Sequence, residues 1–238
     1  MLDNREFSDG KESIQTELIW KNVPTVIAFG GINEGMGMPP FEFFKLLNNV
    51  KVNKVFVRDK QQAWYQLGLD QFLQSPTEVA EQIIQAITLE HNNPRLIMIG
   101  NSMGGYAAML FGLMLNAEQV IAFSPQTFVD RLNRMRFLDF RWAPQINRMH
   151  TAIKQDEAST AHFDLRPLIS KNVYKPRIDV YYSERHRLDR IHAERLRECK
   201  NVFLYPCRAN SHALVRELRD EGKLSEIILR SISDLRVD

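Results

Sequence analysis

The sequence predicts a single α/β domain in which a mostly parallel central sheet carries helices on both faces. Three observations support this: six short apolar runs recur along the chain, helical patterns lie between them, and 238 residues suit one domain. The runs are nearly continuous in Val, Ile, Phe and Tyr, which is typical of strands buried on both faces of a parallel sheet. Alternating strands and helices favour right-handed crossovers, which place helices on both sides.

The strands follow from these apolar runs, and a shorter run before the first of them is a candidate for an edge strand. The runs lie at 23–30, 54–58, 95–100, 120–124, 177–182 and 201–205, and the candidate edge strand lies at 18–20.

The helices follow from capping signals and from the spacing of apolar residues. Ser75, Pro76 and Glu78 form a capping box that opens a helix, because Ser favours the N-cap, Pro the first turn and Glu the third position. Further helices are expected at 41–49, after two prolines, at 106–115, which is almost wholly apolar, and at 191–199 and 213–221, which are amphipathic.

The segment at about 127–170 interrupts this alternation. It contains scattered aromatic residues, two prolines and several arginines, but no pattern that predicts a strand. A long insertion after a strand of an α/β protein is often a cap or lid over the active site. We therefore expect one domain over residues 1–238, with a helical cap inserted at 127–170.

The strongest motif is Gly100-Asn101-Ser102-Met103-Gly104, which stands between a predicted strand and an apolar predicted helix. In such a G-x-S-x-G turn the serine occupies a strained strand-to-helix bend, and small residues on both sides let neighbouring backbone pass closely. The alternative is a tight turn with an incidental serine. The strand-turn-helix context favours Ser102 as a nucleophile.

A serine nucleophile needs a base, and in this arrangement the chain order is serine, acid, histidine. Of the six histidines, His212 follows the last predicted strand and precedes a helix, so it is the expected base. Asp189 follows the preceding strand and is the expected acid, with a helix N-cap as its structural alternative. Glu184 is the other candidate for the acid.

An oxyanion hole needs two backbone N–H groups. One is expected from Met103, after the nucleophile, and the other from Gly31 or Ile32, in the glycine-rich loop that follows the first strand. The same loop could be compared with a dinucleotide-binding fingerprint. It lacks the G-x-G-x-x-G register and the Lys-Ser/Thr ending of a phosphate loop, so no nucleotide cofactor is expected.

With these elements in this order, the chain resembles the α/β-hydrolase superfamily from about residue 23 to residue 229. The resemblance rests on the Gly30-Gly31 loop, the elbow at Ser102, Asp189 and His212. It implies the α/β-hydrolase fold with a cap before the acid, and a serine hydrolase of the esterase or thioesterase type. The superfamily also includes acyltransferases and non-catalytic binding proteins, so both remain alternatives.

Several residues are candidates for binding the substrate. Trp64 and Tyr65 follow the second predicted strand, and Phe41 follows the oxyanion loop; such aromatic residues belong either to the core or to an apolar acyl pocket. The segment 131–148 holds five arginines, including Arg134 and Arg136. These either form a solvated helical face or recognise an anionic group on a substrate.

Composition narrows the remaining possibilities. A formal net charge of +2 gives no reason to expect a nucleic-acid partner, and no apolar run is long enough to span a bilayer. The polar start of the chain lacks the pattern of a signal peptide, and Cys199 and Cys207 lack the spacing of zinc ligands. We expect a cytoplasmic protein that acts on a small acyl ester or thioester without a cofactor or metal; the oligomeric state is left open.

Overall fold

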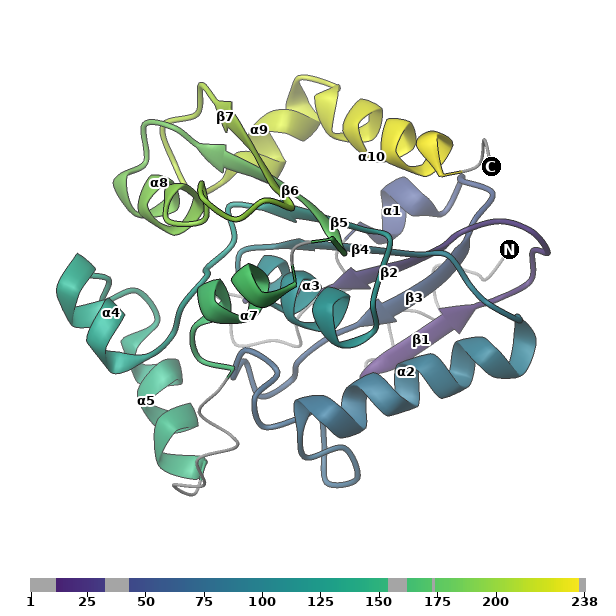
Figure 1. Ribbon diagram of the computed structural model, residues 1–238, viewed down its shortest axis with the longest axis horizontal. Helices are drawn as coiled ribbons and strands as arrows, with labels where there is room; N and C mark the ends of the chain where they lie inside the picture. The colour runs from purple at the N-terminus through teal and green to yellow at the C-terminus, as the bar shows by residue number, and fades with distance from the viewer. Residues whose placement is uncertain (1–11, 33–42, 154–161, 173, 236–238) are drawn as a thin grey trace.

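The computed structural model describes residues 12–32, 43–153, 162–172 and 174–235, and they fold around one seven-stranded sheet (Figure 1). The strands are β1 (Ile14–Glu17), β2 (Thr25–Phe29), β3 (Asn53–Val57), β4 (Leu96–Asn101), β5 (Gln119–Phe123), β6 (Arg177–Ser183) and β7 (Val202–Cys207). Their order across the sheet is β1-β3-β2-β4-β5-β6-β7. Only β1 runs antiparallel to its neighbour, so the prediction of a mostly parallel sheet is confirmed.

The edge strand differs from the expected one. We expected it at 18–20, and it lies at Ile14–Glu17 instead. It pairs with β3, where Glu17 faces Lys54 in the register, and the Lys54 ammonium lies 2.6 Å from the Glu17 carboxylate. Because Lys54 is almost fully buried, this ion pair compensates its charge and fixes the register of β1.

Helices cover both faces of the sheet, as predicted. They are α1 (Phe44–Leu47), α2 (Pro76–Glu90), α3 (Met103–Met114), α4 (Arg131–Phe137), α5 (Ala143–Ala152), α7 (Leu165–Lys171), α8 (Arg187–Glu194), α9 (Leu214–Asp220) and α10 (Lys223–Asp234). In Figure 1, α1, α9 and α10 lie above the sheet, and α2, α3 and α7 lie below it.

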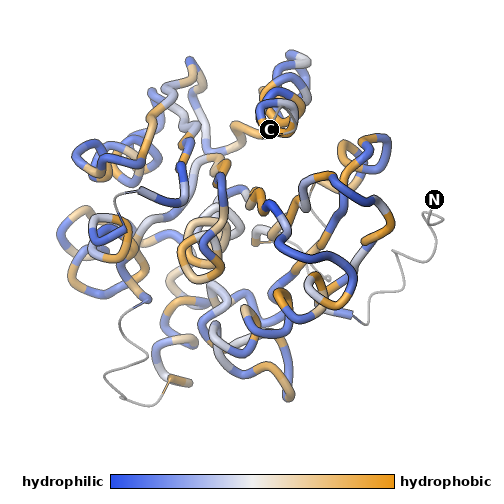
Figure 2. The backbone as a smooth tube through the Cα atoms, turned by 45° about the vertical axis from the view of Figure 1, so that its right-hand side comes forward, coloured by the Kyte–Doolittle hydropathy of each residue, from blue (hydrophilic) through white to orange (hydrophobic). Residues whose placement is uncertain are grey.

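The core is divided by the sheet into two layers because successive strand residues point to opposite faces. In β4, Ile97 and Ile99 pack with α1, α9 and α10, whereas Met98 packs with α2 and α3. Buried residues line almost the whole of α3, whereas the helix that leads to the C-terminus alternates between hydrophobic and hydrophilic positions (Figure 2). The wholly apolar pattern at 106–115 thus marks the central helix.

Helix ends follow local chemistry where the sequence provides it. The Ser75 side chain accepts a hydrogen bond from the Glu78 N–H at 3.3 Å, so the predicted cap of α2 is confirmed. The helix expected at 191–199 begins earlier, at Arg187, because the His186 side chain caps it. The helix α10 was not among the expected ones, and it completes the core layer that also contains α1 and α9.

The inserted segment is helical where it is described. It contains α4, α5 and α7, with one isolated antiparallel bridge between Phe128 and Asp164 and no strand among the residues described between 127 and 170. That this segment caps an active site stays a prediction. Within the described ranges, no helix combines the length and apolarity that a bilayer crossing requires.

Candidate active site

Ser102 occupies a strained turn between β4 and α3. Its backbone has φ 53° and ψ −115°, a conformation that side-chain-bearing residues rarely adopt. A Cβ atom at Gly100 would lie 2.0 Å from the carbonyl oxygen of Gly104, and one at Gly104 would lie 2.3 Å from the carbonyl oxygen of Phe29. Both glycines of the motif are therefore required by close backbone contact.

The strained turn is held by backbone hydrogen bonds on both sides. The Ser102 N–H donates to the Phe123 carbonyl at 2.9 Å, which ties the turn to the end of β5. The Ser102 carbonyl accepts from the Tyr106 N–H at 3.0 Å, which starts α3. These bonds over-determine the backbone, so the strain persists and the serine side chain keeps one direction.

The structure brings Ser102, His212 and Asp189 together. They follow β4, β7 and β6, whose carboxyl ends meet at one edge of the parallel sheet. His212 Nε2 lies 2.8 Å from Ser102 Oγ, and His212 Nδ1 lies 2.7 Å from Asp189 Oδ1. Because an ionised carboxylate only accepts hydrogen bonds, Nδ1 donates to Asp189 and Nε2 is left to accept from the serine hydroxyl.

Asp189 is buried and ionised. Burial by itself raises the pKa of its carboxyl, but the hydrogen bond and charge of His212, and then the charge of His186, outweigh it and hold the pKa below its usual range. The alternative acid, Glu184, is exposed at the end of β6, and its carboxylate makes no hydrogen bond to His212. The geometry therefore favours Asp189 for this position.

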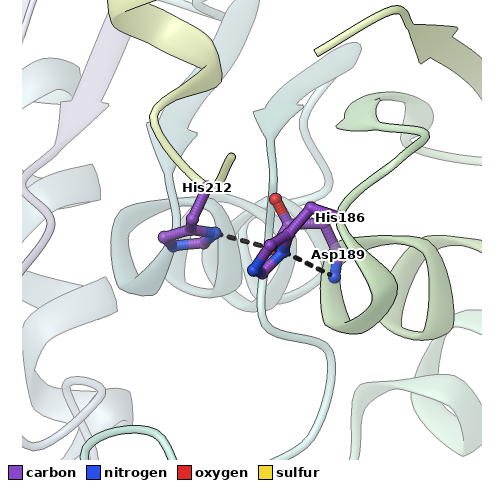
Figure 3. Close-up of side chains that lie close together, drawn as sticks. All are labelled: His186, Asp189 and His212. Atoms are coloured by element: carbon purple, nitrogen blue, oxygen red, sulfur yellow. Dashed lines mark hydrogen bonds and ion pairs between the residues drawn. The ribbon is translucent and has the colours of Figure 1, made fainter. Parts of the chain in front are cut away.

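Asp189 is not the N-cap of α8, which was its structural alternative. That position belongs to His186, whose Nδ1 accepts from the Asp189 N–H at 3.3 Å. The same Nδ1 lies 2.9 Å from Asp189 Oδ1, to which it donates when the ring is protonated, so two imidazoles flank one carboxylate oxygen (Figure 3).

His186, Asp189 and His212 together offer three ligand atoms within 4.8 Å of one another, a spacing that a metal ion could bridge. The guanidinium of Arg141 lies 3.1 Å from the same oxygen, Oδ1 of Asp189. A fixed positive charge there disfavours a divalent cation. The donor set suits a hydrogen-bonded acid better than a metal ligand.

The residues expected to form an oxyanion hole lie beside the elbow. Met103 is the first residue of α3, where backbone N–H groups have no partner within the helix. The contact between Gly104 and Phe29 places the end of β2 against the elbow, and Gly31 and Ile32 follow directly, both half-buried. Their donation to a substrate oxygen stays a prediction.

Trp64 and Tyr65 are both fully buried, as the core alternative predicts, and their part in binding a substrate stays a prediction. The Asp59 carboxylate accepts hydrogen bonds from the N–H groups of Ala63 and Tyr65 at 2.6 and 2.9 Å. These bonds fold the chain back after β3 and turn both aromatic rings into the core.

Both side chains support the site from behind. The Tyr65 hydroxyl donates to the Gly30 carbonyl at 3.0 Å, next to the expected oxyanion loop. Trp64 Nε1 donates at 2.9 Å to Gln126, whose own N–H is 3.4 Å from the Ser102 carbonyl. Gln126 was not identified from the sequence, since no motif marks it.

The arginine segment is not one solvated face. Arg134 is buried, and its guanidinium donates to the backbone carbonyls of Asp139 and Arg141 at 3.2 and 3.5 Å, so it is not open to a substrate anion. Arg136 is exposed, as the solvated alternative predicts. Phe41, the remaining candidate, lies outside the described residues.

Comparison with known proteins identifies the fold. No protein-family model and no curated protein matches this sequence. Among solved structures, the capsule O-acetyltransferase of Neisseria meningitidis serogroup A, a variant in complex with CoA, aligns with a TM-score of 0.65 at 15% identity, over 88% of this chain and 89% of that one.

Serine hydrolases align comparably. The fluorophosphonate-binding serine hydrolase F of Staphylococcus aureus gives a TM-score of 0.60 at 13% identity, over 100% of this chain and 90% of that one. An S-formylglutathione hydrolase from Agrobacterium tumefaciens gives 0.58 at 13% identity, over 86% and 83%. The chain therefore has the α/β-hydrolase fold, as the resemblance implied.

Proposed function

We propose that this chain is a serine-dependent acyl hydrolase that cleaves a small carboxylic ester or thioester through an acyl-enzyme. One observation carries the proposal: an unbroken hydrogen-bonded chain runs from Ser102 Oγ through His212 to the buried carboxylate of Asp189, with steps of 2.8 and 2.7 Å. The strained backbone of Ser102 adds support, because such strain concentrates at functional sites.

In the first step Ser102 Oγ attacks the substrate carbonyl carbon while its proton passes to His212 Nε2. The imidazole becomes positively charged between the serine and Asp189, and the ionised carboxylate stabilises that charge. The carbonyl oxygen becomes an oxyanion, for which the N–H groups of Met103 and of Gly31 or Ile32 are the proposed donors.

The tetrahedral intermediate then collapses. His212 returns the proton to the leaving alcohol or thiol, the bond between carbonyl carbon and leaving group breaks, and the acyl group stays on Ser102. A water molecule repeats the sequence: His212 takes one of its protons, the water oxygen attacks the acyl carbon, and Ser102 leaves as the free hydroxyl.

Acyl transfer to an alcohol or amine is the second candidate. The capsule O-acetyltransferase of Neisseria meningitidis aligns with this chain with a TM-score of 0.65, and the two serine hydrolases align with TM-scores of 0.60 and 0.58. The same residues would form the acyl-enzyme, and an acceptor hydroxyl or amine would replace water in the second step.

Steady-state kinetics on p-nitrophenyl esters and acyl thioesters of varied chain length test the proposal. Ser102→Ala should lower kcat/KM by about 10⁴-fold or more while the protein keeps its fold, because it removes the hydroxyl that is proposed to form the acyl-enzyme. Asp189→Asn should reduce activity by about 10⁴-fold, because it favours the wrong imidazole tautomer. Wild-type rates no higher than those of Ser102→Ala would favour a non-catalytic binding protein.

The two candidate functions can be separated by measuring whether the acyl group ends on water or on an added acceptor. With a hydrolase, added glycerol or a soluble sugar should leave the yield of free acid unchanged. With a transferase, the acceptor should raise turnover and appear acylated by mass spectrometry, since the acyl-enzyme would react with water only slowly.

A further inference from the structure

We propose that Arg141 is a positioning residue that holds the acid of the triad and places a fixed positive charge beside the pair formed by Asp189 and His212. This inference rests on the proposed function of Ser102, His212 and Asp189. It assigns the turn between α4 and α5 an indirect role in the reaction, through Asp189.

Arg141 joins two buried carboxylates. Its Nη1 donates to Asp189 Oδ1 at 3.1 Å, while Nε and Nη2 donate to the two oxygens of Asp139 at 3.0 and 2.8 Å. The Arg141 side chain is 18% exposed, and the two carboxylates are 1% and 4% exposed. A guanidinium that makes a two-pronged bond to one carboxylate has one orientation, and here that orientation is aimed at Asp189.

Asp139 is itself fixed from behind. Its Oδ2 lies 2.8 Å from Nε2 of His192, which is fully buried. Nδ1 of the same imidazole accepts from the Thr127 N–H at 2.9 Å, so Nε2 carries the proton and donates to Asp139. The chain of contacts therefore runs from Thr127, which follows β5, and His192, in α8, through Asp139 and Arg141 to the triad.

The Asp189 carboxylate depends on side chains for its orientation. Among the described residues, no backbone N–H is hydrogen-bonded to it. Its Oδ1 contacts His212, His186 and Arg141, and the Ser124 side chain also helps to lower the pKa of the carboxyl. Both histidines are more than a quarter exposed, whereas Arg141 is anchored by Asp139 and is always charged.

The charge of Arg141 also acts on His212. The neighbours of this imidazole include Ser102 from the elbow, Asp189 from α8 and His186 at the N-cap of α8. Arg141, from the α4–α5 turn, contacts the Asp189 oxygen that bonds His212. Asp189 favours a proton on His212, and the nearby guanidinium opposes it. Replacing Arg141 with an uncharged residue would therefore remove one repulsion against a positively charged His212 ring.

The experiment compares Arg141→Gln, Arg141→Lys and a matched control, Arg190→Gln, with the wild-type full-length chain. Arg190 follows Asp189 in α8 and is exposed, so its replacement removes one positive charge near Asp189 without breaking a buried contact. Two quantities are measured: the NMR titration midpoint of the His212 ring, and the pH profile of fluorophosphonate labelling. Circular dichroism establishes that each variant is folded.

Arg141→Gln should move the His212 midpoint and the acid limb of labelling to higher pH, by about half a pH unit or more. It should also slow labelling about 10- to 100-fold on the plateau, because Asp189 loses its anchor. Arg141→Lys should keep the wild-type midpoint, since it keeps the charge, but should slow the plateau rate because the fork is lost. Arg190→Gln should match the wild type.

An unchanged His212 midpoint in folded Arg141→Gln would overturn the proposal, as would a loss of rate equal at every pH. Failure of the wild type to react with the probe would instead overturn the proposed function. In that case the His212 titration still decides whether Arg141 acts on the imidazole, because it needs no turnover.

Discussion

Gly104 packs directly against Phe29, so that a Cβ atom on the glycine would lie 2.3 Å from the phenylalanine carbonyl oxygen. This contact joins the nucleophile turn to the end of β2, from which the expected oxyanion loop departs. It explains why the second glycine of the motif cannot carry a side chain, and it leads to the first prediction.

Gly104→Ala should push the turn away from β2, since a backbone carbonyl cannot yield as a flexible side chain does. We expect a loss of about 1–3 kcal/mol in the free energy of unfolding. Labelling at Ser102 should slow about 10²-fold, because a small displacement of the site misaligns the reacting groups. Urea denaturation and labelling rates measure the two effects.

Gly222→Ala is the matched control. Gly222 has φ +74° but no neighbour within 4 Å of the added Cβ, so only backbone strain of about 1–2 kcal/mol is expected, with the labelling rate unchanged. Equal labelling by the Gly104 and Gly222 variants would refute the role given to the contact with Phe29.

Tyr65→Phe should weaken the loop that follows β2, because it removes the hydroxyl that donates to the Gly30 carbonyl at 3.0 Å. A buried carbonyl left without its donor costs about 1–3 kcal/mol. We expect kcat to fall more than KM rises, since the loop is proposed to hold the oxyanion and not the substrate as a whole. Tyr174→Phe, at a residue 92% exposed, should change neither quantity.

The residues proposed to carry out the reaction were more predictable from the sequence than the residues that hold them in place. The elbow could be predicted because a local pattern of glycines, a strand and a helix determines it, and His212 and Asp189 because the chain order of parallel strands fixes which ends meet. Arg141 could not, because its partners lie 2 and 48 residues away and only tertiary folding joins them.

The positions of Trp64, Tyr65 and Arg134 were not predictable from the sequence, for a shared physical reason. Trp64 and Tyr65 were candidates for a pocket because they follow a strand at its carboxyl end, but the hydrogen bonds of Asp59 turn them inward. Arg134 was assigned to a cluster of arginines expected to act alike, but the turn after α4 buries it. In each case local hydrogen bonds determine which way the side chain points, and composition alone does not reveal those bonds.

His192 should titrate far below an ordinary histidine. Burial lowers its pKa to about 4, against the opposing effect of Asp139. In ¹⁵N-edited NMR of histidine-labelled protein, one ring, assigned by its absence in His192→Gln, should remain neutral at pH 5.5 with its proton on Nε2. A midpoint near 6.5 would contradict the buried bond to Asp139.

The same residue makes stability depend on pH. Its folded pKa lies below the unfolded value, so the unfolded chain binds more protons between pH 6.5 and 4, and stability is lost as pH falls through this range, by on the order of 3 kcal/mol. Asp59, whose pKa burial raises to about 6, acts in the opposite direction. The effect should therefore be measured as the wild type minus His192→Gln.

Arg134 and Arg136 should differ sharply although they share a short helix. Arg134→Met removes donors to two backbone carbonyls in a buried site and should cost about 1–3 kcal/mol of unfolding free energy. Arg136→Met, at an exposed position, should stay within about 0.5 kcal/mol.

Charge reversal at Arg136 tests whether this exposed arginine recognises an anionic group on the substrate. If it does, Arg136→Glu should slow turnover of an anionic ester more than that of a neutral ester of equal chain length. Equal ratios would remove Arg136 from substrate binding.

The central claim is that Ser102 is an activated nucleophile, and its most direct test is reaction with a fluorophosphonate probe followed by intact mass and peptide mapping. We expect one adduct per chain, located on Ser102, in the wild type and no adduct in Ser102→Ala. Folded wild-type protein that gains no adduct, or gains it at another residue, would contradict the claim.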